Sequence, residues 1–289
     1  MVLTKQTVVL SCFIFLLALL SGCFSQEPLP SGCPPACRNA DLVGVDLEQT
    51  NLQGADLWQV NLSQANLRQA NLSQSDLRGA NLSSTELFGA NLNAANLLGI
   101  DLKQANLEQT SLRAVDLRGA DLRGANLTGA DLSNASLQVT EIDRTTQLDK
   151  KWQLVWEIVN EGGSSRDLGQ VDLSNAHLPG VDLAHSDMRQ ANLSKSDLSN
   201  ANLTLANLYG ANVSEANLRE SSLWEANLNE ANLTAVDLID ADLSHASMQW
   251  TNFAGATLTG VKMEEATYNA STIWPEGFNP EAAGAVLVE

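Results

Sequence analysis

Apolar residues return at every fifth position over most of this chain. From Leu42 to Ile142 there are 21 such positions, and 20 of them are Leu. A second series of 22 positions extends from Leu168 to Ile273, and all are apolar apart from the amphipathic Tyr268. We call these positions the centres. A fixed spacing sustained over this length identifies an internal repeat.

Each unit carries the same pattern around its centre. Two residues before the centre lies a small or β-branched residue, usually Ala, and Asp or Asn usually lies between them, as in Ala-Asn-Leu-Arg-Gln at 65–69. We call the Asp or Asn position the Asx position, and the two residues after the centre the first and second outer residues. We expect the centres and small residues to point inward, and the Asx and outer residues to face water.

A period of five excludes the common regular elements. Five residues of α-helix turn through about 500°, so the centres would spread around a helix instead of forming a stripe. On a flat strand an odd period would place successive centres on opposite faces. The chain must therefore turn once per unit, and repeated turns generate a solenoid whose coils stack as short parallel strands about 4.8 Å apart. The sequence predicts an all-β solenoid.

The repeat unit resembles that of the pentapeptide-repeat family over residues 40–142 and 166–273. The resemblance implies a right-handed quadrilateral β-helix with four units in each coil. The register breaks once, because the 26-residue step from Ile142 to Leu168 is not a multiple of five. We therefore expect two repeat blocks, at 40–144 and 166–273, separated by a short α-helical insert at 145–165.

The insert has a helical pattern of apolar residues. Trp152, Val155, Trp156 and Val159 follow Leu148 at the spacing of one helix face, and Gly162-Gly163 supplies a stop. Thr146 and Asp149 resemble a capping box. The segment 151–160 also resembles the linker of two-block family members from photosynthetic bacteria, which implies a structural hinge. Two alternatives stay open: the face formed by Trp152, Val155, Trp156 and Val159 packs on the repeats, or it binds a partner.

The last repeats differ from the others. Their centres become larger, as at Phe253, Met263 and Ile273, and residues 274–289 follow with two Pro and no repeat. Because an open solenoid end exposes core and strand edges, we expect 274–289 to form a C-terminal cap. A binding loop is the alternative.

The N-terminus has the features of an export signal. Lys5 precedes an apolar stretch at 8–20, which is short for a membrane-spanning helix. The residues Leu20-Ser21-Gly22-Cys23 resemble the bacterial lipobox, which implies a thioether-linked diacylglycerol on Cys23 after removal of a signal peptide at 1–22. An ordinary signal peptide with a chance Cys is the alternative.

Residues 23–39 are expected to form a lipid-anchored tether followed by an N-terminal cap, because the segment is rich in Pro. In an oxidising compartment Cys33 and Cys37 could form a disulfide that closes a small loop. The alternative is two free thiols packed in the cap. A metal site requires more ligands than these two cysteines.

Charge limits the partners. The chain has 34 acidic and 16 basic residues, a formal net charge of −18. This excess of negative charge argues against direct binding to nucleic acid or to an anionic membrane surface.

Candidate catalytic chemistry is sparse. His177, His185 and His245 occupy outward repeat positions, and no pair has the spacing of a metal motif. We expect no catalytic residue, cofactor, metal or small-molecule substrate. With four units per coil, Asp101 and Asp121 would stack, so we expect at most weak and nonspecific cation association there.

The sequence thus favours a noncatalytic, exported, lipid-anchored scaffold that mediates protein–protein interaction at a membrane surface with an unknown protein partner. The expected location is a membrane facing the periplasm or the thylakoid lumen. The alternative is an acidic DNA mimic that inhibits a topoisomerase, as some family members do, and the export signal argues against it.

Overall fold

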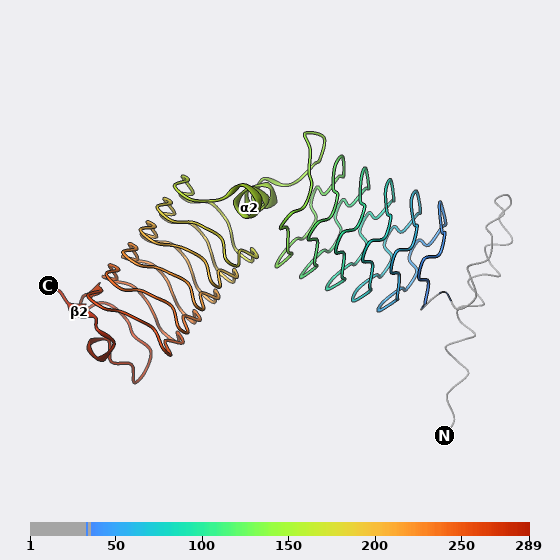
Figure 1. Ribbon diagram of the computed structural model, residues 1–289. Helices are drawn as coiled ribbons and strands as arrows, with labels where there is room; N and C mark the ends of the chain where they lie inside the picture. Colours follow the sequence, from blue (N-terminus) through green and yellow to red (C-terminus); the bar gives the residue numbers. More distant parts are fainter. Residues whose placement is uncertain (1–32, 34–35) are drawn as a thin grey trace, which may run out of the picture. The chain divides into compact units, whose positions relative to one another are not determined.

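The computed structural model describes residue 33 and residues 36–289 of the chain (Figure 1). Its named elements are helix α2 (Lys150–Glu161), strands β1 (Thr267–Tyr268) and β2 (Val286–Leu287), and the 3-10 helix η1 (Glu281–Ala283). The predicted signal peptide and the lipidation site Cys23 lie outside the described residues. Within the described part of the chain, no helix has the length and apolarity needed to cross a bilayer.

The repeats form coils of twenty residues. Parallel bridges join residues twenty apart from Ala36↔Asp56 to Asp121↔Glu141, and again from Asp167↔Asp187 to Ser247↔Thr267. We call these the first and second repeat runs. Twenty residues are four units, so the chain turns four times in each coil, which confirms the predicted β-solenoid.

Each unit makes the same turn. Leu62 O accepts a hydrogen bond from Ala65 N at 3.0 Å, and the second outer residue between them, Gln64, has φ 60°. A positive φ at the third residue is typical of a type II turn, which favours Gly there. Many second outer residues are nevertheless Gln, Glu, Asn or Ala with φ between 52° and 60°, so the stacked coils hold non-Gly residues in this conformation.

The Asx positions differ from the expectation that they face water. Most are half-buried. The side-chain oxygen of Asn61 accepts the backbone N–H of Ser63 at 3.3 Å, and Asp46 accepts that of Glu48 at 3.2 Å. These side chains therefore satisfy a turn donor that would otherwise lack a partner.

The centres form the core. Every centre from Leu42 to Leu137 is at most 7% exposed, and those from Leu168 to Tyr268 are at most 8% exposed. Where Ser or Thr replaces the small Ala, the buried hydroxyl donates to a centre carbonyl, as from Thr85 to Leu62 at 2.9 Å. A polar group can therefore enter this narrow core because a backbone acceptor is within reach.

Both runs end with one extra residue. The last bridges are Asn126↔Gln147 and Asn252↔Ile273, each 21 residues apart. The prediction that Ile273 is a buried centre is wrong, because this shift places it outside the core at 52% exposure. Trp274 lies over Phe253 instead, with stacked rings 4.8 Å apart.

Helix α2 lies between the two runs in the chain, within the predicted insert at 145–165. Gly162 ends it, donating its N–H to Ile158 O at 3.2 Å, as the Gly-Gly pair predicts. The capping-box prediction is wrong, because the N-cap Asp149 makes no side-chain cap bond. The Thr146 hydroxyl instead donates to Leu122 O at 3.0 Å.

Candidate functional site

The predicted partner-binding face of helix α2 is largely covered by the chain itself. Trp152 and Val155 are buried, and Val159 is half-buried. Trp156 donates its indole N–H to Thr140 O of the first run at 3.0 Å. The partner-binding alternative is therefore wrong for Trp152 and Val155, since both side chains are used in packing.

Helix α2 contacts both runs. Asn160 donates its amide to Leu137 O at 3.0 Å, and Lys151 lies 3.1 Å from the Asp172 carboxylate in the second run. Ile158, which was not among the residues of the predicted face, is 2% exposed. A Cβ built on Gly163 would lie 3.4 Å from Ile158 and 2.6 Å from Leu183. The helix therefore bonds to both runs, and Ile158 and Leu183 lie on either side of the backbone at Gly163.

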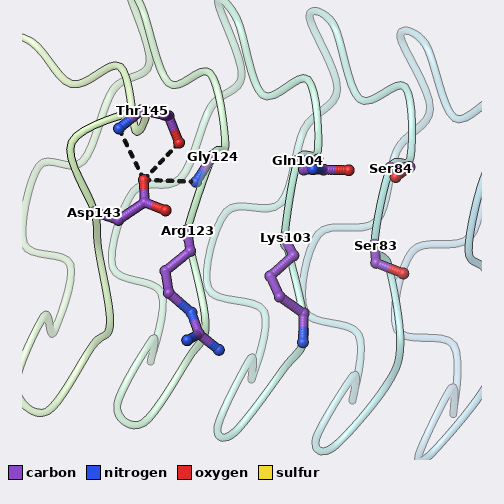
Figure 2. Close-up of a pocket in the computed structure, with 8 residues that line it drawn as sticks. All are labelled: Ser83, Ser84, Lys103, Gln104, Arg123, Gly124, Asp143 and Thr145. Carbon is purple, nitrogen blue, oxygen red and sulfur yellow. Dashed lines mark hydrogen bonds between the residues drawn. The ribbon is translucent and has the colours of Figure 1, made fainter.

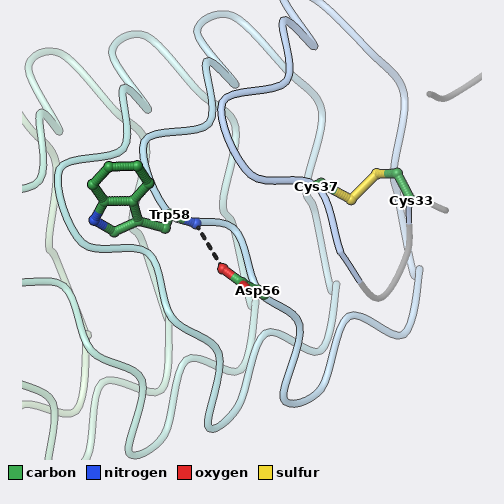
Figure 3. The surroundings of a disulfide bond; sticks show 4 residues. All are labelled: Cys33, Cys37, Asp56 and Trp58. Carbon is green, nitrogen blue, oxygen red and sulfur yellow. Dashed lines mark hydrogen bonds between the residues drawn. A yellow bond between two sulfur atoms is a disulfide. The ribbon is translucent and has the colours of Figure 1, made fainter. Parts of the chain in front are cut away.

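The N-terminal end of the first run carries a disulfide between Cys33 and Cys37 (Figure 3). Cys37 is 2% exposed and lies five residues before Leu42, so it is itself a centre. Its N–H donates to Asp56 O of the next coil at 2.8 Å. The prediction placed this pair in a cap ahead of the first repeat, although the spacing of five would have identified Cys37 as a centre.

Side chains at the Asx positions stack into columns along the coils. In one column Asn212 donates its amide to Asn192 at 3.2 Å, and Asn232 donates to Asn212 at 3.1 Å. The Ser194 hydroxyl donates to the Asn192 oxygen at 2.8 Å. These polar groups bind one another and the turns, so they stabilise the stack.

The stacked carboxylates of the first run have cationic partners within the chain. Lys103 lies 2.9 Å from Asp101 and 3.4 Å from Asp121, and Arg123 lies 2.6 Å from Asp121. The hydrogen bond from Arg123 lowers the pKa of Asp121 to about 2. These cations offset the repulsion on which the expectation of cation association rested.

A depression of about 520 Å³ lies beside these cations (Figure 2). Its edge includes Asp143, whose carboxylate accepts the N–H of Thr145 at 2.9 Å and of Gly124 at 3.2 Å. Because Lys103 and Arg123 pair with carboxylates and Asp143 holds a turn, the charged groups of this depression have structural roles.

The histidines lie outside any catalytic arrangement in the described part of the chain. His177 lies 3.3 Å from the Asp197 carboxylate and lowers its pKa to about 2. His245 lies 3.3 Å from Glu265 and edge-on to Trp224, with ring centroids 5.6 Å apart. Among residues 33 and 36–289, no group of three metal-ligating side chains occurs.

Comparison with known proteins identifies the repeat. A model of the family described as Pentapeptide repeats matches more than half of the chain, at residues 36–69, 65–104, 95–138, 167–204, 206–244 and 231–267. No curated protein sequence matches the chain significantly.

Several solved structures are similar. A pentapeptide repeat protein (Rfr23) from the cyanobacterium Cyanothece 51142 is 34% identical, over 40% of this chain and 93% of that one, with a TM-score of 0.40. HetL, involved in heterocyst differentiation regulation in Nostoc sp. strain PCC 7120, is 27% identical over 83% and 93% of the two chains (TM-score 0.31). QnrB1, a plasmid-mediated fluoroquinolone resistance protein, is 19% identical over 79% and 92% (TM-score 0.30). With TM-scores this low, the superpositions carry no functional argument.

Proposed function

Because the chain belongs to the pentapeptide-repeat family, we propose that it is a noncatalytic scaffold that binds a protein partner. Members of this family are generally structural or interaction proteins. One observation carries the proposal: polar side chains at the Asx positions bind one another from coil to coil, as in the ladder from Asn192 to Asn232. Over the described coils, such a surface presents repeated polar side chains to a macromolecule, and the polar groups that bond within the ladder are already used in stabilising the stack.

We further propose that the scaffold is a right-handed quadrilateral β-helix in two blocks, with helix α2 as the insert between them. The spacing of twenty residues between bridged positions supports four sides. The contacts of α2 with Leu137 and Asp172 support its role in joining the blocks.

The proposed location is a membrane surface outside the cytoplasm. The lipobox-like residues Leu20-Ser21-Gly22-Cys23 support export and a lipid anchor on Cys23, facing the periplasm or the thylakoid lumen. The disulfide between Cys33 and Cys37 also supports an oxidising compartment.

The anchor is tested by comparing the wild type with Cys23→Ser in the native host. We expect the wild type to sediment with membranes and to resist extraction with salt, and the variant to lose this association. A Cys37→Ser variant controls for general damage to the N-terminus. Equal sedimentation of the wild type and Cys23→Ser would reject the anchor.

Protein binding is tested by a photo-crosslinking amino acid placed on each of the four sides of the first run in turn. Exposed first outer residues on these sides are Val43, Gln53, Leu98 and Thr128. We expect one side to crosslink the same protein reproducibly in the native host. Absence of crosslinks from all four sides and from the second run would reject the scaffold.

A second candidate is the acidic DNA mimic that inhibits a topoisomerase, which the net charge of −18 favours. The pairing of carboxylates with Arg or Lys, as in Asp121 with Arg123, weakens this candidate because it reduces the resemblance to a row of phosphates. A supercoiling assay with a type II topoisomerase decides between them. The scaffold predicts no inhibition by the mature protein, and stoichiometric inhibition would favour mimicry.

A further inference from the structure

One side of the first run carries cationic and apolar residues in strict alternation. Its first outer residues, on five successive coils, are Arg38, Trp58, Arg78, Leu98 and Arg118. We call them the arginine column. The three Arg side chains are 57%, 45% and 57% exposed, and Leu98 is 41% exposed. Trp58 is half-buried, with the Arg38 guanidinium 5.8 Å from its ring centroid.

Each Arg of the column is held in place by an Asp of the same side. Arg78 donates its Nε–H and an Nη2–H to Asp76 at 2.8 and 2.6 Å, and Arg118 makes the same pair of bonds to Asp116. Arg38 pairs with Asp56. A guanidinium has five N–H donors, so this pairing fixes the fork and leaves donors for a second acceptor.

The side that carries the column differs in charge from the chain as a whole. The chain has a net charge of −18, but on this side three Arg match three Asp. The second outer residues beside Arg78, Leu98 and Arg118 are all Gly, on three successive coils: Gly79, Gly99 and Gly119. A Cβ on Gly99 or Gly119 would have no neighbour within 4 Å. The Arg, Trp and Leu side chains therefore stand beside a low strip, and Arg and Trp are enriched where protein interfaces bind most strongly.

The spacing of the column selects the partner. Coils stack about 4.8 Å apart, so successive Arg residues lie about 9.6 Å apart, with an apolar residue midway. In an α-helix, residues seven apart lie about 10.5 Å apart along one face, with another residue of that face about half-way. Residues on one face of a β-strand lie about 6.7 Å apart, which matches neither spacing. Long Arg side chains can absorb the small mismatch with a helix over two intervals.

We propose that the arginine column binds an acidic amphipathic α-helix of the protein partner, laid along the stack of coils. Carboxylates at every seventh residue of that helix accept from Arg38, Arg78 and Arg118, and apolar residues between them pack on Trp58 and Leu98. This inference rests on the proposed function, since it names the kind of partner that the scaffold binds.

The test uses a stapled helical peptide of three heptads, with Glu at every seventh position and Leu midway between, and fluorescence anisotropy with the mature protein. We expect the double variant Arg78→Ala/Arg118→Ala to weaken binding at least about tenfold, and Leu98→Ala about threefold. Arg189→Ala is the matched control, because Arg189 makes the same bonds to Asp187 but has Gly169 and Tyr209 as column neighbours. This control should change affinity less than twofold.

Three results would overturn the inference. The first is an equal loss of peptide affinity in the double variant and in Arg189→Ala. The second is that a control peptide, with its Glu residues distributed around the helix, binds as tightly as the designed peptide. The third is tighter binding of a single-stranded oligonucleotide than of the acidic peptide. Thermal unfolding followed by circular dichroism confirms that each variant is folded. If the peptide does not bind, but a protein partner crosslinks at Thr128 or on another side without the arginine column, this inference fails and the proposed function stands. If no side crosslinks a protein, the proposed function fails as well.

Discussion

The two repeat runs close with the same turn but have different covers. Asp143 and Asn269 begin the two closing turns, and each side-chain oxygen accepts an N–H from the coil before it, that of Gly124 and of Trp250 respectively. Three residues later, Thr146 and Thr272 donate their hydroxyls to Leu122 O and Met248 O. Both turns add the residue that shifts the register by one.

The segments after the two turns are different. After the first, helix α2 buries Trp152, Val155 and Ile158 and bonds to both runs. After the second, Trp274 lies over Phe253 and edge-on to Tyr268, and β2 pairs with β1. A cover between two runs must meet two coil ends, which a helix with several buried residues can do. A cover at the end of the second run meets one coil, for which one indole ring and a short strand suffice.

The largest expected effect lies at the second cover. Trp274→Ala removes the ring stacked on Phe253, and we expect a loss of about 3–4 kcal/mol in the free energy of unfolding. Trp274→Phe should cost less than about 1 kcal/mol, because the indole N–H is buried without a hydrogen-bond partner. Urea unfolding measures both. A loss below about 1 kcal/mol in Trp274→Ala would show that the ring does not cover the core, and the 57% exposed Trp250 supplies the control Trp250→Ala.

The next largest loss of stability is expected from a substitution in helix α2. Ile158 is buried beside Gly163, so Ile158→Ala leaves a cavity there, and we expect a cost of about 2–3 kcal/mol. Gln153→Ala, at an exposed position of the same helix, should change stability by less than about 0.5 kcal/mol. In Ile158→Ala, we expect the backbone amides of the coils next to α2 to exchange hydrogen faster than in the wild type, in both runs. Faster exchange in only one run would mean that the helix covers only that run.

The closing turns should respond alike. Thr146→Val and Thr272→Val each remove a hydroxyl that donates to a centre carbonyl and accepts the N–H of Asp143 or Asn269. We expect each to cost about 1–2 kcal/mol in chemical unfolding. Costs that differ by more than about 1 kcal/mol between the two variants would contradict a common closing turn.

The smallest effect concerns acid stability. Since Arg123 lowers the pKa of Asp121 from its usual 3.8 to about 2, the pairing stabilises the folded state above about pH 4. This contribution, about 1 kcal/mol after solvent screening, is lost as the pH falls from about 4 to about 2. Asp121→Asn should remove this part of the pH dependence when unfolding is measured from neutral pH down to about pH 2. An unchanged acid slope in the variant would show that the pairing adds no stability.

The regular coils could be predicted from the sequence because one spacing is repeated more than forty times. The period of five places centres such as Leu107 in the core, where the side chain is fully buried. The four-sided coil came from the family resemblance, since periodicity alone does not set the number of turns in a coil. The helical spacing of Trp152 and Val155 predicts that both lie on one helix face.

The departures from the regular repeat are harder to predict from the sequence, because they depend on contacts between coils. The extra residue before Ile273 cannot be distinguished by hydropathy, since Ile fits a centre as well as a surface bridge. The shared pattern Asp-Arg-Thr-Thr at 143–146 and Asn-Ala-Ser-Thr at 269–272 is the signal that could have shown it. The arginine column likewise requires the spacing of twenty residues before its members come together.

The most direct test of the proposed function asks where the chain is, because the nature of its partner depends on the compartment. The measurement is the mass of the N-terminal peptide of the protein isolated from its native host. We predict a chain that begins at Cys23 and carries lipid. A soluble, unlipidated chain that begins at Met1 would contradict the exported scaffold and would make topoisomerase inhibition the next hypothesis to test.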